Sequence, residues 1–282
     1  MQHTPYTVKS SMASAGILYS EELSGRTILS LSGDSGEQED FLQSLVTNDI
    51  ARAAPDTLVY AALLTPQGKY LADFFIWRSA TGDFQLDVAS ALAGDLVRRL
   101  TMYRLRRPLE ITGAVAPVTA CWGADPGHGA LRDPRHPDLG WRSYSPLSID
   151  SEPGDYDLHR LKLGIPESGT DLLVNDSYIL EAGFERLHGV DFRKGCYVGQ
   201  EIVARMKFKT ELRKGLCPVT VTGSAPPQTA LHTSSGKLAG HLLSNRDGYG
   251  LAHLRYDRAD GALSTSNEGA VIRKTIESNY IK

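Results

Sequence analysis

The chain has 282 residues, of which 41% are hydrophobic and 22% charged, and its formal net charge is −3. These fractions are ordinary for a packed soluble protein and exclude a fibrous, low-complexity or wholly disordered chain. A net charge this close to zero gives no global attraction to nucleic acid or to an anionic membrane. No apolar run approaches the ~20 residues that span a bilayer, so we expect no membrane partner.

The cysteines and the N-terminus bear on the compartment. Cys121, Cys196 and Cys217 contain no CxxC pair, which argues against a disulfide framework or a zinc cluster and fits a reducing environment. The first residues lack the apolar segment of a signal peptide, and we expect residues 1–13 to form a loose extension. The sequence therefore predicts a cytoplasmic protein.

The first half of the chain alternates strands and helices. An amphipathic pattern predicts helices over 36–46 and 91–103, and Ser35 with Gln38 forms a capping box ahead of the first. Apolar runs and turn residues predict strands at 26–31, 58–64, 70–77, 84–88 and 109–112. This order describes an α+β fold on a mostly antiparallel sheet.

The second half changes character twice. Residues 123–154 are rich in Gly, Pro, Asp and His and are predicted to be loop, before helices near 156–163 and 179–187. After about 210, short apolar segments separated by Gly, Pro and an Asn-Arg-Asp-Gly turn predict a small β-barrel or sandwich. We expect one region over 14–209 and a C-terminal barrel domain over 210–282.

The segment FRKGCYVGQEIVAR, which contains Cys196, is the most informative. Arg193 and Lys194 precede the cysteine, and nearby cations favour the thiolate, the form that attacks electrophiles or binds metal. Gly195 and Gly199 allow the backbone to approach a ligand closely. The alternative is that Cys196 is a small buried apolar residue and that its basic neighbours are a solvated face.

This segment resembles the signature of the YgfZ family, folate-binding relatives of the glycine-cleavage T-protein (aminomethyltransferase) that assist iron–sulfur cluster assembly or repair. The match comprises Lys194, Gly195, Cys196, Tyr197, Val198, Gly199, Gln200 and Glu201. Segments at 41–50, 63–76, 103–111, 159–172 and 250–257 occur in the family's order. The resemblance implies a T-protein-like ring of α+β subdomains with a C-terminal β-barrel, tetrahydrofolate or a related reduced folate as cofactor, and Cys196 as the catalytic residue.

Two carboxylates gain a role from the resemblance. Asp73, in GKYLAD, falls where T-proteins carry an aspartate beside the reactive folate nitrogens. Glu181, in LEAG, matches the glutamate that holds the pterin ring. A carboxylate suits a pterin because it accepts hydrogen bonds from both the amino group and the adjacent ring N–H. Considered alone, Asp73 would be a strand-end or turn residue and Glu181 an exposed helix residue.

The chain also departs from the pattern. The aspartate pair typical of T-proteins is Ala72-Asp73 here, which weakens the expectation of aminomethyl transfer because that reaction must move protons at a folate nitrogen. Many family members continue with a His-Arg-Gly-like segment where this chain has Met206 and the residues that follow, so no family residue is transferred there.

Basic clusters suggest anion binding. Arg98, Arg99 and Arg104 belong to a run of arginines that could attract a folate's glutamate tail or RNA phosphate, although clustered charge on a helix is more often a solvated face. His128 and His136 lie among aspartates with no recognisable ligand spacing, so no metal site is predicted.

The leading hypothesis is a folate-binding accessory protein of iron–sulfur cluster assembly or repair, with the assembly machinery or client iron–sulfur proteins as partners. The alternatives are a folate-dependent one-carbon (aminomethyl or methyl) transferase and a tRNA-modification factor that binds tRNA.

Overall fold

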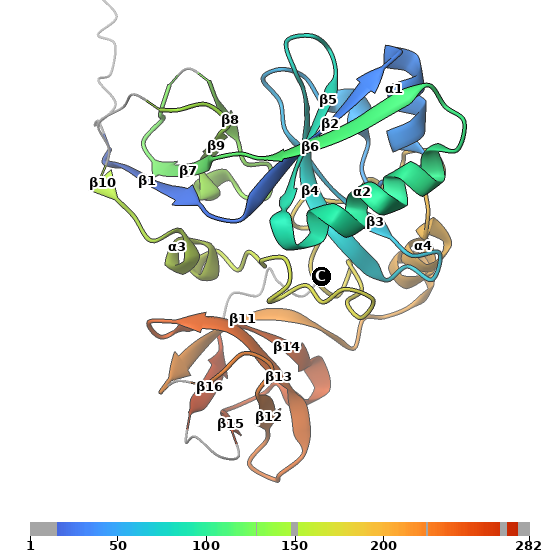
Figure 1. Cartoon of the computed structure of the whole chain (residues 1–282). Coiled ribbons are helices and arrows are strands. Elements are labelled where there is room, and N and C mark those ends of the chain that lie inside the picture. Colours follow the sequence, from blue (N-terminus) through green and yellow to red (C-terminus); the bar gives the residue numbers. More distant parts are fainter. Residues whose placement is uncertain (1–15, 128, 148–151, 224, 266–269, 276–282) are drawn as a thin grey trace, which may run out of the picture.

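The computed structural model describes residues 16–127, 129–147, 152–223, 225–265 and 270–275, so the extension predicted at 1–13 lies outside the described residues. One antiparallel sheet has the strand order β3-β4-β5-β2-β6. Its strands are β2 (Arg26–Gly33), β3 (Val59–Leu64), β4 (Tyr70–Arg78), β5 (Phe84–Ala89) and β6 (Leu109–Val115). Helices α1 (Ser35–Gln43) and α2 (Ser90–Arg104) accompany this sheet, and the 3-10 turn η1 (Ile50–Arg52) follows α1 (Figure 1).

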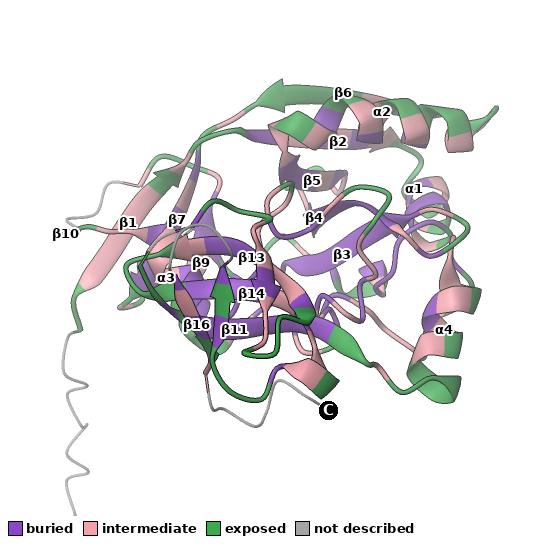
Figure 2. Cartoon of the chain, turned by 90° about the horizontal axis from the view of Figure 1, so that it is seen from below, coloured by how far each residue is buried: buried purple, intermediate pink, exposed green. Residues whose placement is uncertain are grey.

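The strands β3 and β4 are buried along nearly their whole length because both faces of the sheet are covered (Figure 2). On β3, alternate side chains enter two different apolar clusters: Ala61 and Leu63 pack toward α1 and α2, whereas Tyr60 and Leu64 pack toward the second half of the chain. The two strands are joined by the turn whose Gly68 has a φ of 74°, a conformation that glycine adopts at little cost.

The cap of α1 differs from the predicted capping box. Asp34 is the N-cap, and its side chain accepts from the N–H groups of Gly36 and Glu37. Gln38 instead donates to the carbonyl of Gly33 at 2.9 Å and accepts from the N–H of Phe84 at 3.1 Å. Because Gln38 satisfies strand-end groups of β2 and β5, it is not available to the helix start.

Strands also occur in and around the segment predicted to be loop. A second sheet has the order β10-β1-β7-β9-β8, formed by β1 (Leu18–Leu23), β7 (Val118–Gly123), β8 (Ala130–Arg132), β9 (Trp141–Ser143) and β10 (Glu152–Pro153), with the turn η2 (Pro137–Leu139). The prediction of loop over 123–154 was therefore wrong in part. Strands of two or three residues are too short to produce a readable alternation. They are defined by pairing instead: β9 with β7, β8 with β9, and β10 with β1.

Helices in the middle of the chain were predicted with mixed success. Helix α3 (Tyr156–Lys162) is confirmed, but residues 179–187 form successive turns instead of a helix. Gly183 has a φ of 79° there, which interrupts any regular right-handed helix. Helix α4 (Gln200–Lys209) was not predicted, although Val203 is buried and Met206 packs against the same apolar cluster.

The C-terminal region is a closed barrel in the order β11-β14-β13-β12-β15-β16, as the sequence predicted. Its strands are β11 (Lys214–Thr222), β12 (Ala230–His232), β13 (Leu238–Arg246), β14 (Tyr249–Arg255), β15 (Leu263–Thr265) and β16 (Val271–Lys274), with the turn η3 (Tyr256–Arg258). The barrel joins the rest of the chain through a buried network: Arg160 of α3 contacts Asp171 at 2.9 Å and donates to the hydroxyl of Ser244 on β13 at 3.0 Å.

Candidate functional site

Cys196 lies in the loop that leads into α4. Of the three cysteines, all within the described residues, Cys196 is exposed while Cys121 and Cys217 are buried. Burial raises the pKa of each of those two thiols to about 11, so they stay protonated near neutral pH. The exposed thiol is therefore the one that an incoming molecule can reach.

Lys194 is folded away from solvent although it stands two residues before the exposed thiol. Its ammonium donates to the main-chain carbonyls of Val46 at 2.7 Å, Asn48 at 2.8 Å and Gln43 at 2.9 Å. Burial lowers the pKa of Lys194 to about 8, so the group is still largely an ammonium at pH 7. Arg193, in contrast, has a side chain that is 93% exposed.

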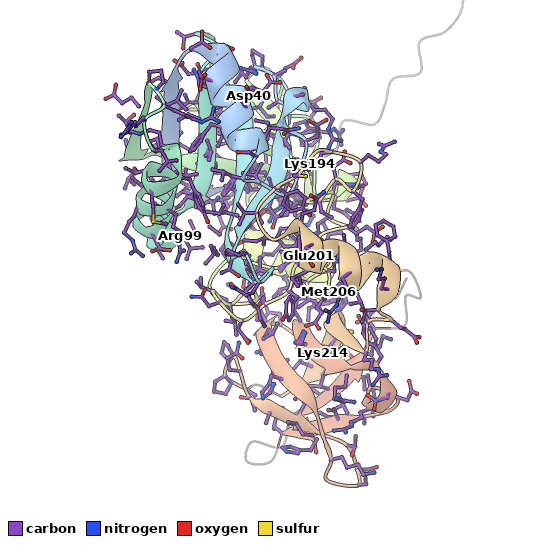
Figure 3. All side chains as sticks on the ribbon, turned by 90° about the vertical axis from the view of Figure 1, so that its right-hand side faces the viewer. Asp40, Arg99, Lys194, Glu201, Met206 and Lys214 are labelled. Atoms are coloured by element: carbon purple, nitrogen blue, oxygen red, sulfur yellow. The ribbon has the colours of Figure 1, made fainter. Side chains whose placement is uncertain are left out.

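The remaining signature residues fix the backbone around the thiol. Tyr197 is buried in the core, while Gly199 has a φ of 85° and lies against the β3–β4 turn, where an added Cβ would be 2.6 Å from the carbonyl oxygen of Thr65. Gln200 begins α4 and Glu201 is exposed in its first turn. Figure 3 shows Lys194, Glu201, Met206 and Lys214 along one side of the molecule, from the first sheet toward the barrel.

The segment Thr47-Asn48 forms the seat for this loop, although its sequence pattern did not mark it as part of a site. The Thr47 hydroxyl donates to the carbonyl of Gly189 at 2.7 Å. The Asn48 amide donates to the carbonyls of His188 at 2.7 Å and Tyr60 at 2.8 Å. Both residues are buried, with exposures of 0% and 3%. In the sequence, the only indication of this role was that two adjacent polar residues follow the apolar positions of α1.

Asp73 lies on β4, buried among hydroxyl groups. Tyr60 donates to its Oδ2 at 2.9 Å, and Tyr70 and Ser168 each donate to its Oδ1 at 2.5 Å. These neutral donors hold the carboxylate in place as an acceptor. Asp73 also lines a cavity of about 210 Å³, together with Phe75 and Tyr156.

Arginines form the charged wall of the Asp73 cavity. Arg26, Arg135, Arg142 and Arg160 all line it. Buried carboxylates compensate them: Asp87 contacts Arg26 at 2.6 Å, and Asp133 contacts Arg135 at 2.8 Å. These guanidinium groups hold the pKa values of Asp87 and Asp133 below the usual range despite burial, which by itself would raise them.

One guanidinium nitrogen in this wall lacks a hydrogen-bond partner. Arg142 Nη2 is buried and has no hydrogen-bond partner among the described residues, although it lies 2.9 Å from Asp87 Oδ2. We regard this contact as an ion pair without hydrogen-bond geometry. Besides Asp73, the acidic residues Glu21, Glu22, Asp157 and Glu167 line the cavity together with the arginines, so it suits a ligand that carries both donors and acceptors.

Glu181 lies in a different place from Asp73. It lines a crevice of about 90 Å³ against the barrel, where its Oε2 is 3.2 Å from His253 Nε2 and 3.5 Å from Lys214 Nζ. Asp171 lines this crevice and its partner Arg160 lines the Asp73 cavity, so their ion pair stands between the two spaces. The structure does not bring the two predicted folate carboxylates into one cavity.

The predicted anion-binding arginines belong to α2 and face neither space. Arg98 and Arg99 both pair with Asp95 on the same helix. Arg104 donates to the carbonyl of Leu109 at 2.5 Å. These arginines therefore find their partners within α2 and in the segment that connects it to β6.

Metal ligation and membrane insertion find no support in the described part of the chain. Within it, no group of His, Cys, Asp or Glu side chains has an arrangement that could hold a metal ion, and His128 lies outside those residues. The helices in the described ranges are all too short or too polar to cross a membrane.

Comparison with known proteins identifies the family. The iron–sulfur cluster assembly factor IBA57 of Homo sapiens, a mitochondrial protein, is 32% identical over 295 residues, covering 89% of this chain and 81% of that protein. The chain belongs to the IBA57 family. The IBA57 of Mus musculus is 30% identical, covering 86% of this chain and 78% of that protein. The IBA57 homolog of Mycosarcoma maydis is 31% identical, covering 68% of this chain and 55% of that protein.

Two further comparisons concern the fold. Residues 213–277 match the family described as CAF17, C-terminal beta-barrel domain. The glycine cleavage system aminomethyltransferase T from Bartonella henselae superposes with a TM-score of 0.70 at 12% identity, covering 92% of this chain and 86% of that one. The predicted T-protein-like fold with a C-terminal barrel is thereby confirmed.

Membership of the IBA57 family bears on the remaining sequence predictions. The resemblance to YgfZ is confirmed at the level of the fold and of a family of iron–sulfur assembly factors, whose relatives here carry the name IBA57. The predicted cytoplasmic location is wrong: these IBA57 relatives are named as mitochondrial, which points to that compartment. A mitochondrial matrix is also a reducing setting for thiols, so cysteine content alone did not separate the two compartments.

Proposed function

We propose that this protein acts in iron–sulfur cluster assembly, with the Cys196 thiol as the group that contacts the cluster or its sulfur and with a reduced folate in the Asp73 cavity. The observation that carries the proposal is the exposed Cys196 in a loop fixed on both sides, in a chain whose curated relatives are named iron–sulfur cluster assembly factors. Soft thiolate ligands are those that iron–sulfur clusters use.

The residues around Asp73 fit the pterin part of a folate. The remaining acceptor position of Asp73 would take one N–H of the pterin, the wall arginines would donate to the pterin carbonyl oxygen, and Phe75 offers an aromatic face. The volume of about 210 Å³ is below the ~300 Å³ of pockets that enclose drug-sized ligands, so the ring system fits but the glutamate tail would extend outside. When bound, a reduced folate would supply an electron-rich, reducing ring.

The same geometry argues against one-carbon transfer. Ala72 replaces the second carboxylate, and both oxygens of Asp73 already accept hydrogen bonds from Tyr60, Tyr70 and Ser168. Three of the ~four acceptor positions of this carboxylate are thus occupied, and the second carboxylate that could move a proton at a folate nitrogen is absent. The cavity therefore suits binding better than proton transfer.

Complementation tests the role of the thiol. In cells that lack their own copy of the protein, Cys196→Ser should fold but fail to restore the activity of an iron–sulfur enzyme. Cys121→Ala and Cys217→Ala serve as controls because both thiols are buried and should leave restoration intact. Full restoration by Cys196→Ser would refute the essential thiol.

Calorimetry tests the folate. Tetrahydrofolate should bind the wild type, and Asp73→Asn should weaken it by roughly 10- to 100-fold, as expected for loss of a charged hydrogen-bond acceptor. Glu181→Gln is the matched carboxylate-to-amide control in the separate crevice. A loss caused by Glu181→Gln alone would move the ligand to the crevice, and absence of binding to the wild type would remove folate from the proposal.

A further inference from the structure

The partners of Lys194 come from a part of the chain about 150 positions away in sequence. Gln43 is the last residue of α1, and Val46 and Asn48 follow it. The carbonyls at the C-terminal end of a helix lack partners within the helix and carry its negative dipole end. The last turn of α1 contains no basic residue, so Lys194 supplies from a distance the cation that this helix end lacks.

The chemistry of an ammonium matches this acceptor set. A lysine ammonium has three N–H donors, and the carbonyls of Gln43, Val46 and Asn48 converge on it within 2.9 Å. The Gln43 side-chain oxygen approaches at 3.3 Å as a weaker fourth acceptor. Such a partly buried, charge-assisted arrangement holds a side chain more firmly than an ion pair at the surface does.

The loop is held at further points on each side of Cys196. Before it, the carbonyls of His188 and Gly189 bind Asn48 and Thr47. After it, Gly199 lies against the β3–β4 turn and Tyr197 is buried. Exposure of Cys196 is therefore not a sign of looseness, because its neighbours are attached to the first sheet and to the end of α1.

We propose that Lys194 is a positioning residue, which holds the Cys196 loop on the C-terminal end of α1 and does not act as a charge that activates the thiol. The functional importance of a fixed thiol rests on the role proposed above for Cys196. The positioning of the loop by Lys194 is inferred from the hydrogen bonds of Lys194 and does not depend on that role. Residues 41–50, one of the segments that resemble the family, contain the three carbonyls that bind Lys194.

A nitroxide spin label on Cys196 tests the clamp without a cluster or a folate. The label should attach to the exposed thiol and leave the buried thiols unmodified. In the wild type its spectrum should show hindered motion, whereas Lys194→Met should give a sharp, mobile component. The main-chain amides of Asp191 and Gln200 donate to the carbonyls of Thr47 at 3.1 Å and Tyr197 at 3.2 Å. Their exchange should become roughly 10- to 100-fold faster, as for loss of a charged hydrogen bond, while barrel residues 216–221 keep their protection.

The matched control is Lys209→Met, which removes the same charge from the exposed last residue of α4. It should leave both the spectrum and the exchange unchanged. Lys194→Gln is a second variant in case the methionine variant does not fold. Its shorter side chain carries an amide with two donors, so it should give an intermediate mobility.

The alkylation rate of Cys196 distinguishes a Lys194 that positions the loop from a Lys194 that activates the thiol. If Lys194 only positions the loop, alkylation at pH 7.5 should be as fast in Lys194→Met as in the wild type, or faster, while restoration of an iron–sulfur enzyme falls. Slower alkylation with unchanged label mobility would overturn the inference in favour of activation. Full restoration by Cys196→Ser would refute the proposed function, whereas the label and exchange results would still decide the clamp.

Discussion

The Cys196 loop and the Asp73 cavity place their reactive groups in opposite ways. At Cys196 the sulfur is exposed and the residues beside it, Lys194 and Tyr197, are the ones that are packed and bonded. At Asp73 the carboxylate itself is buried and bonded by surrounding hydroxyls. The first arrangement suits contact with another macromolecule or its cargo, and the second suits a small ligand selected by shape and hydrogen bonding.

The largest effect is expected from a substitution that displaces the backbone of the Cys196 loop from the β3–β4 turn. Gly199→Ala would place a Cβ 2.6 Å from the carbonyl oxygen of Thr65 at a φ of 85°. We expect a loss of about 2–4 kcal/mol in the free energy of unfolding, since a left-handed non-glycine residue costs about 1–3 kcal/mol before the clash is added. Urea denaturation measures it.

Gly195→Ala is the matched control for that substitution, because a Cβ at Gly195 meets nothing within 4 Å. Its free energy of unfolding should stay within about 0.5 kcal/mol of the wild type, as for most surface changes. Equal losses for both variants would show that the loop is not seated against the β3–β4 turn.

Thiol reactivity sharpens the contrast between exposed and buried sulfur. Because burial raises the pKa values of Cys121 and Cys217 from 9.0 to about 11, their thiolate fraction near pH 8 is about 100-fold below that of an unperturbed thiol. Iodoacetamide should therefore modify Cys196 at least that much faster, as mass spectrometry of timed digests would record. Comparable modification of all three would contradict the buried assignment.

The same thiols give a pH dependence of stability. A pKa that is raised in the folded state means that the unfolded chain loses its protons first as pH rises. The contribution of Cys121 and Cys217 is thus complete below pH 9 and is lost as pH approaches about 11. Thermal unfolding of a Cys121→Ala, Cys217→Ala double variant should lose less stability over this interval than the wild type.

Substitutions of Asp73 and Glu181 should change the free energy of unfolding by smaller amounts. Asp73→Asn replaces an acceptor of several hydroxyls by a group that is partly donor, and should cost about 1–3 kcal/mol of unfolding free energy. Glu181→Gln weakens contacts with the half-exposed Lys214 and His253, and should cost no more than about 1 kcal/mol. Denaturation curves in which Glu181→Gln is the more damaging would reverse the assignment of the buried carboxylate.

Local pattern explains which parts of the fold could be predicted. The hairpin over 58–77 follows from two apolar runs around Thr65-Pro66-Gln67-Gly68, and the barrel follows from short strands with frequent turns. Residues 179–187 misled because their apolar spacing is helical while Gly183 takes a left-handed conformation. The strands β8 and β9 pair with each other, and β9 also pairs with β7, but strands of three residues are too short to show an alternation in the sequence.

The site was predictable only as separate residues. The signature identified Cys196, and the structure leaves it exposed, but the charge of Lys194 was expected to serve the thiol and is instead bound by carbonyls of the α1 end. Asp73 and Glu181 look equivalent in sequence, yet the Arg160–Asp171 pair stands between their two spaces. The Lys194 contacts with Val46 and Asn48 join residues 148 and 146 positions apart, and local sequence pattern does not predict contacts at that separation.

The contact between Arg160 and Ser244 has a consequence for the modular use of this chain. A truncated chain that ends before β11 would leave the Arg160–Asp171 pair without the hydroxyl and the backbone N–H of Ser244, which donates to Asp171 at 2.9 Å. Opening a buried ion pair in this way is costly. The barrel matches a family by itself, yet an exchanged barrel would keep these hydrogen bonds only if it presented a hydroxyl and a backbone N–H at the position of Ser244.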